Sequence, residues 1–146
     1  MTWTYQHSIE TTASREELWR HWSDIASWPQ WNAGIRAMEV EGPFAVGTTF
    51  TMTPPDGEPV RMRLTEVVPR RVFTDEADGG DFVVRTVHQL EPLPDGRTRV
   101  TYRTDIVGAA ADHVGPEIGP AITADFPDVL AALVGLAEAA AEPAGP

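Results

Sequence analysis

Two residue types are missing from the 146-residue sequence: cysteine and lysine. Without cysteine the chain has no disulfide, no thiolate zinc site and no thiol nucleophile. Without lysine it has no Schiff-base amine, no phosphate-loop lysine and no serine–lysine dyad. All 11 basic residues are therefore arginines, and 22 acidic residues outnumber them. These absences exclude several enzyme classes before any motif is considered.

Positive charge and long apolar runs are also scarce. The formal net charge is −11, whereas a nucleic-acid-binding protein needs a basic face. We therefore predict that nucleic acid is not a partner. No run of about 18 apolar residues is present, and Met1–His7 lacks a basic segment followed by an apolar one. We expect neither a membrane span nor a secretory signal, and we expect a cytoplasmic location.

Polar residues with the spacing of a metal or hydrolase site are absent as well. The sequence contains no HExxH motif and no His-x-His pair. It also lacks the Gly-x-Ser-x-Gly elbow of a hydrolase nucleophile. Gly79-Gly80 is followed by neither lysine nor a helical pattern, so it predicts a hairpin turn rather than a phosphate cradle. We expect no metal and no cofactor.

Strand signals dominate the first three quarters of the chain. Segments in which apolar and polar residues alternate are separated by turns rich in Gly and Pro, which is typical of half-buried antiparallel strands. The expected strands are 3–9, 35–41, 48–53, 60–68, 71–77, 82–91 and 97–107. The strand 82–91 alternates most clearly, with Val84, Thr86 and His88 on one face. The pattern in Arg71–Ala77 is compatible with either face pointing inward.

Two short helices are expected after the first strand. Ser14 followed by Glu17 three residues later forms a capping box, which predicts a helix that runs to Trp22. A second short helix should end at Trp28-Pro29, because proline disfavours a helical residue before it.

A long helix is expected at the C-terminal end. Residues 109–116 are small and predict a loop. Residues 117–141 carry apolar side chains every three or four positions, which predicts an amphipathic helix. Pro127 should kink this helix, because proline removes a backbone donor. We expect one domain over residues 1–142 and a flexible tail over 143–146.

Several short motifs occur in a characteristic order along the chain. They are Ala13-Ser-Arg-Glu-Glu-Leu-Trp19, Trp28-Pro-Gln-Trp-Asn32, Gly47-Thr-Thr-Phe50, Glu66-Val-Val-Pro-Arg-Arg71, His88-Gln-Leu-Glu-Pro92, Gly96-Arg-Thr-Arg-Val-Thr101 and Leu133-Val-Gly-Leu-Ala-Glu138. Their order and spacing resemble the polyketide cyclase/dehydrase and lipid transport superfamily (START-like, SRPBCC), and the resemblance covers nearly the whole chain. It implies an α+β helix-grip fold, in which a curved antiparallel sheet of about six to seven strands surrounds a long C-terminal helix.

A curved sheet cannot touch a long helix along its full length, so the gap between them holds either large side chains or a ligand. We predict a cavity there for a small hydrophobic or aromatic molecule. The predicted lining residues are Trp28, Trp31, Phe50, Met52, Met62, Leu64, Val84, Thr86, Thr104, Ile122, Phe126 and Leu130. The alternative interpretation of the same residues is an ordinary packed core.

His88 and Tyr102 are the candidate catalytic residues. An imidazole titrates close to neutral pH, so His88 could act as an acid or base. The Tyr102 phenol could orient a ligand carbonyl. The alternative for His88 is a structural hydrogen bond to a backbone carbonyl or to Tyr102.

The resembled superfamily includes aromatic polyketide cyclases, lipid and sterol carriers, ring-hydroxylase subunits and activators of a chaperone ATPase. Two functional hypotheses follow for this chain, which we expect to be a monomer or a homodimer. The first is a binding protein, or a cyclase/dehydratase, for a hydrophobic ring-containing metabolite. The alternative is a ligand-free protein-interaction module similar to the chaperone activators.

Overall fold

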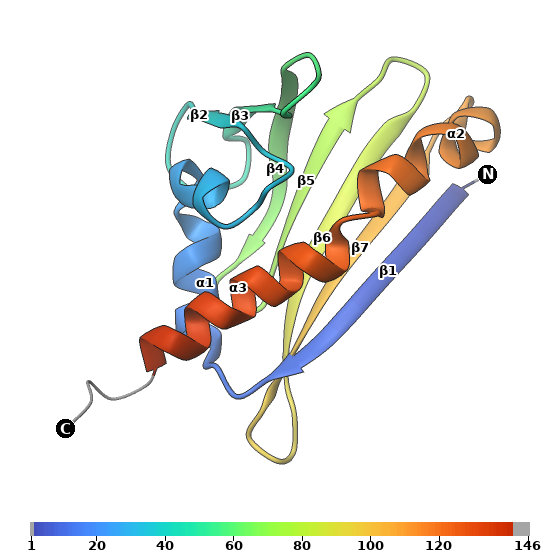
Figure 1. The fold of residues 1–146 in the computed structure, drawn as a ribbon. Coiled ribbons are helices and arrows are strands. Elements are labelled where there is room, and N and C mark those ends of the chain that lie inside the picture. Colours follow the sequence, from blue (N-terminus) through green and yellow to red (C-terminus); the bar gives the residue numbers. More distant parts are fainter. Residues whose placement is uncertain (1, 142–146) are drawn as a thin grey trace.

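Seven antiparallel strands form one curved sheet in the computed structural model, which describes residues 2–141 (Figure 1). The strands are β1 (Thr2–Thr11), β2 (Ala37–Val40), β3 (Thr49–Thr53), β4 (Val60–Val68), β5 (Val72–Asp78), β6 (Val83–Pro92) and β7 (Thr98–Val107). Their order is β1-β7-β6-β5-β4-β3-β2, so the first strand lies beside the last. Every predicted strand is present, with no end shifted by more than two residues. The predicted tail, 143–146, lies outside the described residues.

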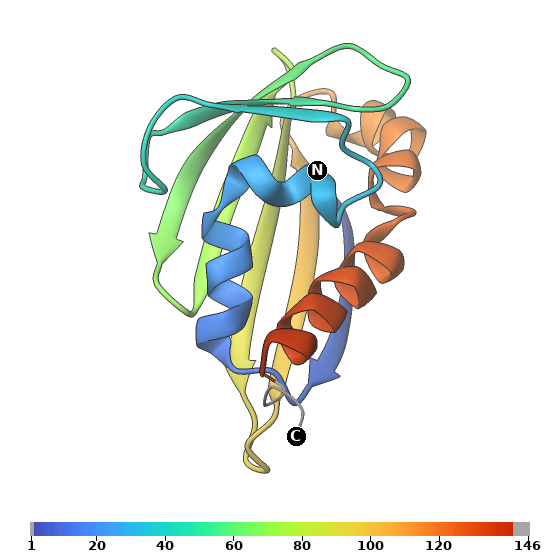
Figure 2. The same ribbon diagram turned by 60° about the vertical axis from the view of Figure 1, so that its left-hand side comes forward.

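Two short helices follow β1, as the capping box predicts. In helix α1 (Arg15–Ser23) the Ser14 hydroxyl accepts a hydrogen bond of 3.1 Å from the Glu17 N–H. The 3₁₀ helix η1 (Ile25–Gln30) passes through Pro29 and ends one residue later. Figure 2 shows α1, η1 and the C-terminal helix on the same concave side of the sheet. The fold is therefore the expected helix-grip arrangement.

The C-terminal helical region differs from the prediction in two ways. Helix α2 (Ala111–Thr123) begins inside the segment 109–116, for which we expected a loop, and helix α3 (Phe126–Ala141) follows after a break at residues 124–125. Pro127 lies in the first turn of α3 rather than at a kink inside one helix. The break precedes Pro127 because proline cannot donate to the carbonyl four residues earlier, whereas a first helical turn needs no such donor.

Helix α2 forms in spite of a composition that disfavours helices. Its glycines Gly115 and Gly119 are buried against Trp3 of β1, and its prolines are exposed. A Cβ atom on Gly119 would lie 2.6 Å from three atoms of the Trp3 indole, and one on Gly115 would lie 2.4 Å from the Trp3 Cβ. Only glycine permits this close approach. The packing of Trp3 therefore stabilises a helix that local propensity alone does not predict.

The helical stretch Ala111–Ala139 is also long and apolar enough, by length and composition, to cross a membrane. One such helix is weak evidence for a membrane span, since core helices share these properties. Leu130, Leu133 and Ala137 are fully buried in the core cluster between this stretch and the sheet. The burial of its inner face gives the stretch the role of a core helix.

A layer of four rings crosses the inner face of the sheet. Phe73, His88 and Tyr102 are direct neighbours on β5, β6 and β7, and Trp22 of α1 packs on them. The Phe73 and His88 rings stack with centroids 3.9 Å apart, and the Trp22 Nε1–H donates to the Tyr102 hydroxyl at 3.0 Å. We call these four residues the ring layer. Beyond it, toward Leu90, the interior is solid core.

We predict that Gly119→Ala destabilises the protein by about 1–3 kcal/mol, because the added methyl group overpacks the Trp3 contact. Gly135→Ala is the matched control, since Gly135 lies in α3 with nothing within 4 Å of its would-be Cβ. That change should raise the free energy of unfolding by about 0.5–1 kcal/mol. Urea unfolding of both variants measures these changes in the free energy of unfolding. Equal effects would contradict the proposed Trp3 packing.

Candidate functional site

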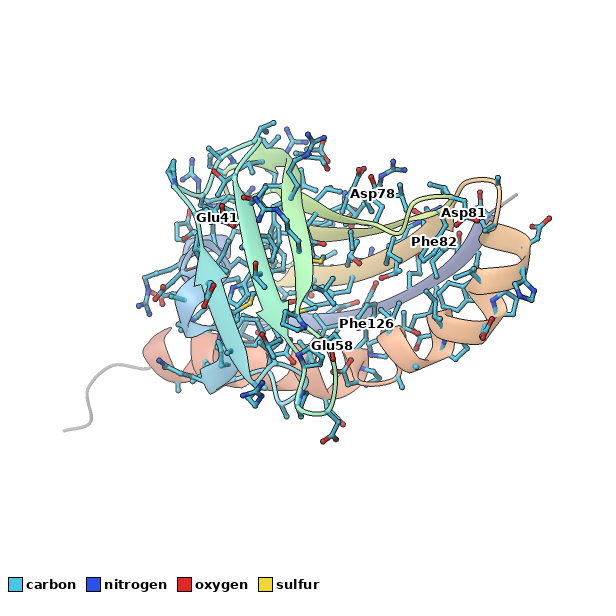
Figure 3. All side chains as sticks on the ribbon, turned by 90° about the horizontal axis from the view of Figure 1, so that it is seen from above. Glu41, Glu58, Asp78, Asp81, Phe82 and Phe126 are labelled. Carbon is cyan, nitrogen blue, oxygen red and sulfur yellow. The ribbon has the colours of Figure 1, made fainter. Side chains whose placement is uncertain are left out.

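A cavity of about 560 Å³ lies on the other side of the ring layer, between the inner face of the sheet and helices α2 and α3. Figure 3, seen from above, places Phe126 between α3 and the strands. The lining residues are Trp28, Trp31, Asn32, Gly34, Ile35, Phe50, Met52, Pro54, Val60, Met62, Phe73, Asp75, Ala77, Val84, Thr86, His88, Tyr102, Glu117, Ile118, Ala121, Ile122, Asp125, Phe126 and Val129. The sheet and the helices therefore do not close on each other.

Both candidate catalytic residues and most of the predicted lining residues stand in the cavity wall. The predicted lining residues found there are Trp28, Trp31, Phe50, Met52, Met62, Val84, Thr86, Ile122 and Phe126. Ile122 is also partly exposed to solvent at 37%. The structure thus brings together side chains from η1, four strands and both C-terminal helices.

Leu64, Thr104 and Leu130 do not reach the cavity, contrary to the prediction. All three are fully buried. Leu64 and Leu130 pack inside the core cluster. The Thr104 hydroxyl lies 2.9 Å from that of Thr86, with which it forms a hydrogen bond. The alternation of each strand or helix predicted the inward direction of these residues, but not which neighbours would cover them.

Asp75 is the buried acidic residue of the sheet among the wall residues that were not predicted from the sequence. It lies on β5 between Phe73 and Ala77, which both also line the cavity. The phase of this strand follows from its pairing, in which Phe73 faces His88 and Asp75 faces Thr86. In the sequence, Asp75 shares one face of the strand with Phe73 and Ala77, and this pattern could have indicated an acidic residue on an apolar face. Without the pairing partner, that pattern did not show which face points inward.

His88 is held in its neutral form. Its Nδ1 lies 3.2 Å from the Phe73 carbonyl oxygen, and because a carbonyl only accepts, Nδ1 carries the proton and donates. Burial lowers the pKa of His88 to about 3. The expectation of a group that titrates near neutral pH is therefore wrong for this position. The structural hydrogen bond to a backbone carbonyl is present, and the Nε2 atom is left as an acceptor.

Tyr102 keeps its phenolic proton. Burial is the main reason that the pKa of Tyr102 is raised above its ordinary value. Its oxygen accepts from Trp22 Nε1 at 3.0 Å, so the hydroxyl hydrogen remains available for donation. The ring of Phe126 packs edge-on to the Tyr102 ring, with centroids 5.5 Å apart. Tyr102 therefore offers a hydrogen-bond donor at the floor of the cavity.

The pKa of Asp75 is raised, whereas that of His88 is lowered. Only 4% of the residue is exposed, and burial, with a smaller effect of the neighbouring Glu76 charge, raises the pKa of Asp75 to about 8. No hydrogen bond within residues 2–141 holds its carboxylate. In the empty cavity at neutral pH, Asp75 is therefore mostly an uncharged carboxylic acid. Within the described residues, no group of three or more potential metal ligands gathers here or elsewhere.

The free energy of unfolding should depend on pH through the protonation of Asp75. Its pKa is higher in the folded chain than the ordinary 3.8, so its contribution to stability is complete below about pH 4 and is lost as the pH rises to about 8. We predict that the stability advantage of Asp75→Asn over the unmodified protein grows by about 2–3 kcal/mol between about pH 5 and pH 7. Asp56→Asn, in the exposed β3–β4 turn, is the control. Urea unfolding at both pH values checks this, and parallel pH profiles for the two variants would contradict it.

Comparisons with known proteins agree with this architecture. The family model for polyketide cyclase / dehydrase and lipid transport proteins matches residues 2–138. No curated protein sequence matches the chain.

Solved structures with the same fold include a plant enzyme and bacterial proteins. Norcoclaurine synthase from Thalictrum flavum, in complex with dopamine and hydroxybenzaldehyde, superposes with a TM-score of 0.77 at 17% identity, over 99% of this chain and 90% of that one. The di-domain ARO/CYC protein StfQ of the steffimycin biosynthetic pathway gives 0.77 at 13% identity, over 97% of this chain and 52% of that one. A START superfamily protein from Mycobacterium smegmatis gives 0.73 at 16% identity, over 94% and 99%. Identities this low establish a shared fold and nothing more specific.

Proposed function

Because this chain belongs to the polyketide cyclase/dehydrase and lipid transport family, we propose that it binds a small, mainly apolar, ring-containing molecule in the cavity between the sheet and helices α2 and α3. The observation that carries this proposal is the cavity itself. Its volume of about 560 Å³ falls within the roughly 300–1,000 Å³ typical of small-molecule sites. Its wall is largely aliphatic and aromatic, with a few polar groups that converge on the interior.

The aromatic side chains of the wall are arranged to receive a ring. Trp28 and Phe50 meet edge to face with centroids 5.7 Å apart, and Tyr102 and Phe126 do the same at 5.5 Å. A ligand ring inserted between these two pairs would add further edge-to-face contacts, each worth about 0.5–1.5 kcal/mol beyond the apolar area buried. Met52 and Met62 can adapt their flexible side chains to its outline.

A cyclase-like reaction is the second candidate, and the adjacency of Tyr102 and His88 favours it. Their rings are 4.6 Å apart, with a phenolic donor beside an imidazole acceptor. Such a pair can hold a carbonyl and an adjacent acidic C–H or O–H group of a folded substrate. Confinement of two reacting carbons can itself lower a barrier by about 7–11 kcal/mol. The lowered pKa of His88 makes it a weak base, so we place binding first.

The ligand-free interaction module remains the alternative to both candidates. Asp125, Asp128 and Glu138 would argue against it if all three lay on the outer face of the C-terminal helix. Asp125 lines the cavity, however, and Glu138 accepts a 2.6 Å hydrogen bond from Thr11. Of the three, only Asp128 is exposed. The case for binding therefore rests on the cavity and not on the charge of the helix.

Filling the cavity should abolish binding without unfolding the protein. We predict that Ala77→Leu, which adds a larger side chain to the wall, removes the thermal shift caused by apolar ring compounds such as tetralin. Ala131→Leu, on the exposed side of α3, should leave that shift unchanged. Native mass spectrometry of gently purified protein should show a carried small molecule that Ala77→Leu lacks. Protein that is always empty and never stabilised by ring compounds would favour the interaction module.

The Tyr102 hydroxyl at the floor of the cavity should donate a hydrogen bond to a ligand carbonyl. We predict that Tyr102→Phe weakens tetralone binding about five- to tenfold, because one hydrogen bond worth about 1–1.5 kcal/mol is lost. Tetralin, which has the same shape without the carbonyl, should bind both proteins equally. Tyr5→Phe is the matched control, since Tyr5 packs on Phe126 from outside the wall. Calorimetric titration on samples whose circular dichroism is unchanged decides this. Equal losses for tetralone and tetralin would contradict a directing role for Tyr102.

A further inference from the structure

The Asp75 carboxyl is the one acidic group on the sheet side of the cavity wall. Its neighbours on the same strand face, Phe73 and Ala77, are apolar, and Thr86 stands directly opposite on β6. Opposite side chains in an antiparallel pair have Cβ atoms about 4.5–5.5 Å apart. Yet no described residue pairs with this carboxyl, although the residue is 96% buried, which follows from its 4% exposure. Buried polar groups are normally satisfied, so a carboxyl that borders the cavity without a partner among the described residues points to a ligand group.

The groups of the wall that can carry a charge near neutral pH are acidic, because the buried His88 stays neutral. Glu117 of α2 and Asp125 of the α2–α3 junction line the cavity together with Asp75, and no arginine is among the lining residues. The Asp125 carboxylate packs against the loop after η1. A Cβ atom on Gly34 of this loop would lie 2.5 Å from Asp125 Oδ2. A positively charged ligand group therefore meets carboxylates along the wall and no competing cation.

Aromatic rings complete the surroundings of Asp75. The rings of Trp28 and Phe73 both line the cavity, with centroids 5.8 Å apart. Aromatic faces attract organic cations, most strongly where water is excluded. A carboxylate, a neighbouring hydroxyl on Thr86 and aromatic rings together match the needs of an ammonium group attached to an apolar body.

We propose that the cavity selects molecules that join an aromatic ring to a protonated amine, with the ammonium group paired to Asp75 and hydrogen-bonded to Thr86. This inference rests on the proposed function and specifies its ligand class. Carboxylate-bearing ligands are disfavoured by the same wall, because they would face Asp75, Glu117 and Asp125 with no basic partner.

Binding of such a ligand should release a proton. Asp75 is mostly protonated in the empty cavity below about pH 8, whereas an ammonium group stabilises the carboxylate. Amine affinity should therefore rise as the pH rises toward 8, by up to about tenfold per pH unit.

Other ionisable groups packed around Asp75 act differently or more weakly. His88 on β6 has its pKa lowered to about 3 and stays neutral, and Tyr102 on β7 keeps its proton because its pKa is raised. Asp125 and Glu117 face the cavity from the helices, and burial raises the pKa of Asp125. Glu76 on the same strand adds a negative charge close to Asp75. Asp75→Asn separates the effect of Asp75 from that of all these groups.

The test compares naphthylethylamine with naphthylethanol, which share an apolar body and differ in the charged group. Calorimetric titrations at about pH 6 and about pH 7.5, in buffers of different ionisation enthalpy, give affinity and proton release. We expect the amine to bind at least tenfold more tightly than the alcohol at the higher pH, with release of up to one proton. Asp75→Asn should remove the preference and the pH dependence, and Asp128→Asn, on the exposed face of α3, should keep both.

The outcomes separate the two proposals. If neither compound binds and other ring compounds also fail, the proposed function is wrong. If the alcohol binds as tightly as the amine, the cavity binds ring compounds but the amine selectivity is wrong, and Asp75 is a neutral hydrogen-bonding group. If Asp75→Asn prefers the amine over the alcohol as strongly as the unmodified protein does, another group binds the ammonium and the pairing with Asp75 is wrong. Should Asp75→Asn fail to fold, the proton release of the unmodified protein still decides, since its absence overturns the pairing with Asp75.

Discussion

The ring layer is the contact on which the rest of the molecule depends. Trp22, Phe73, His88 and Tyr102 join α1 to three adjacent strands, and they do so with rings that reach far from the backbone. On one side of the layer the interior is closed by aliphatic packing. On the other side a cavity separates the sheet from helices α2 and α3. The same layer thus completes the core and forms the floor of the cavity.

His88 in this floor and Asp75 beside it are both buried, and the fold holds both side chains uncharged at neutral pH. His88 achieves this with a lowered pKa and a hydrogen bond to a carbonyl, and Asp75 with a raised pKa and no partner. Their contributions oppose each other: between about pH 4 and 6, falling pH destabilises the fold through His88 and favours it through Asp75. A satisfied imidazole is a structural element. An unsatisfied carboxyl is tolerated only at a cost, which a ligand can offset.

Much of the fold could be predicted from the sequence, because local rules and packing agree in most segments. The alternation in β6 and the capping box at Ser14 predicted their elements correctly. The first half of helix α2 was missed because Trp3, distant in sequence, overrides the effect of the glycines and prolines of this helix. Most of the predicted lining residues do line the cavity, but Asp75 was not among them, since the phase of β5 depends on its partner β6. Leu64, Thr104 and Leu130 show the remaining limit: facing inward does not decide whether a side chain meets a void or a neighbour.

The pairing of β1 with β7 has a consequence for the order in which the chain acquires its structure. Thr2 lies opposite Val107, so the first strand has no partner until more than a hundred residues have been synthesised. Trp3 on that strand is also the surface on which α2 forms. Closing so long a loop is entropically costly and slow compared with local hairpins. During translation, the central hairpins can therefore assemble first, and the cavity is enclosed only when β1 pairs with β7 and α2 packs on Trp3.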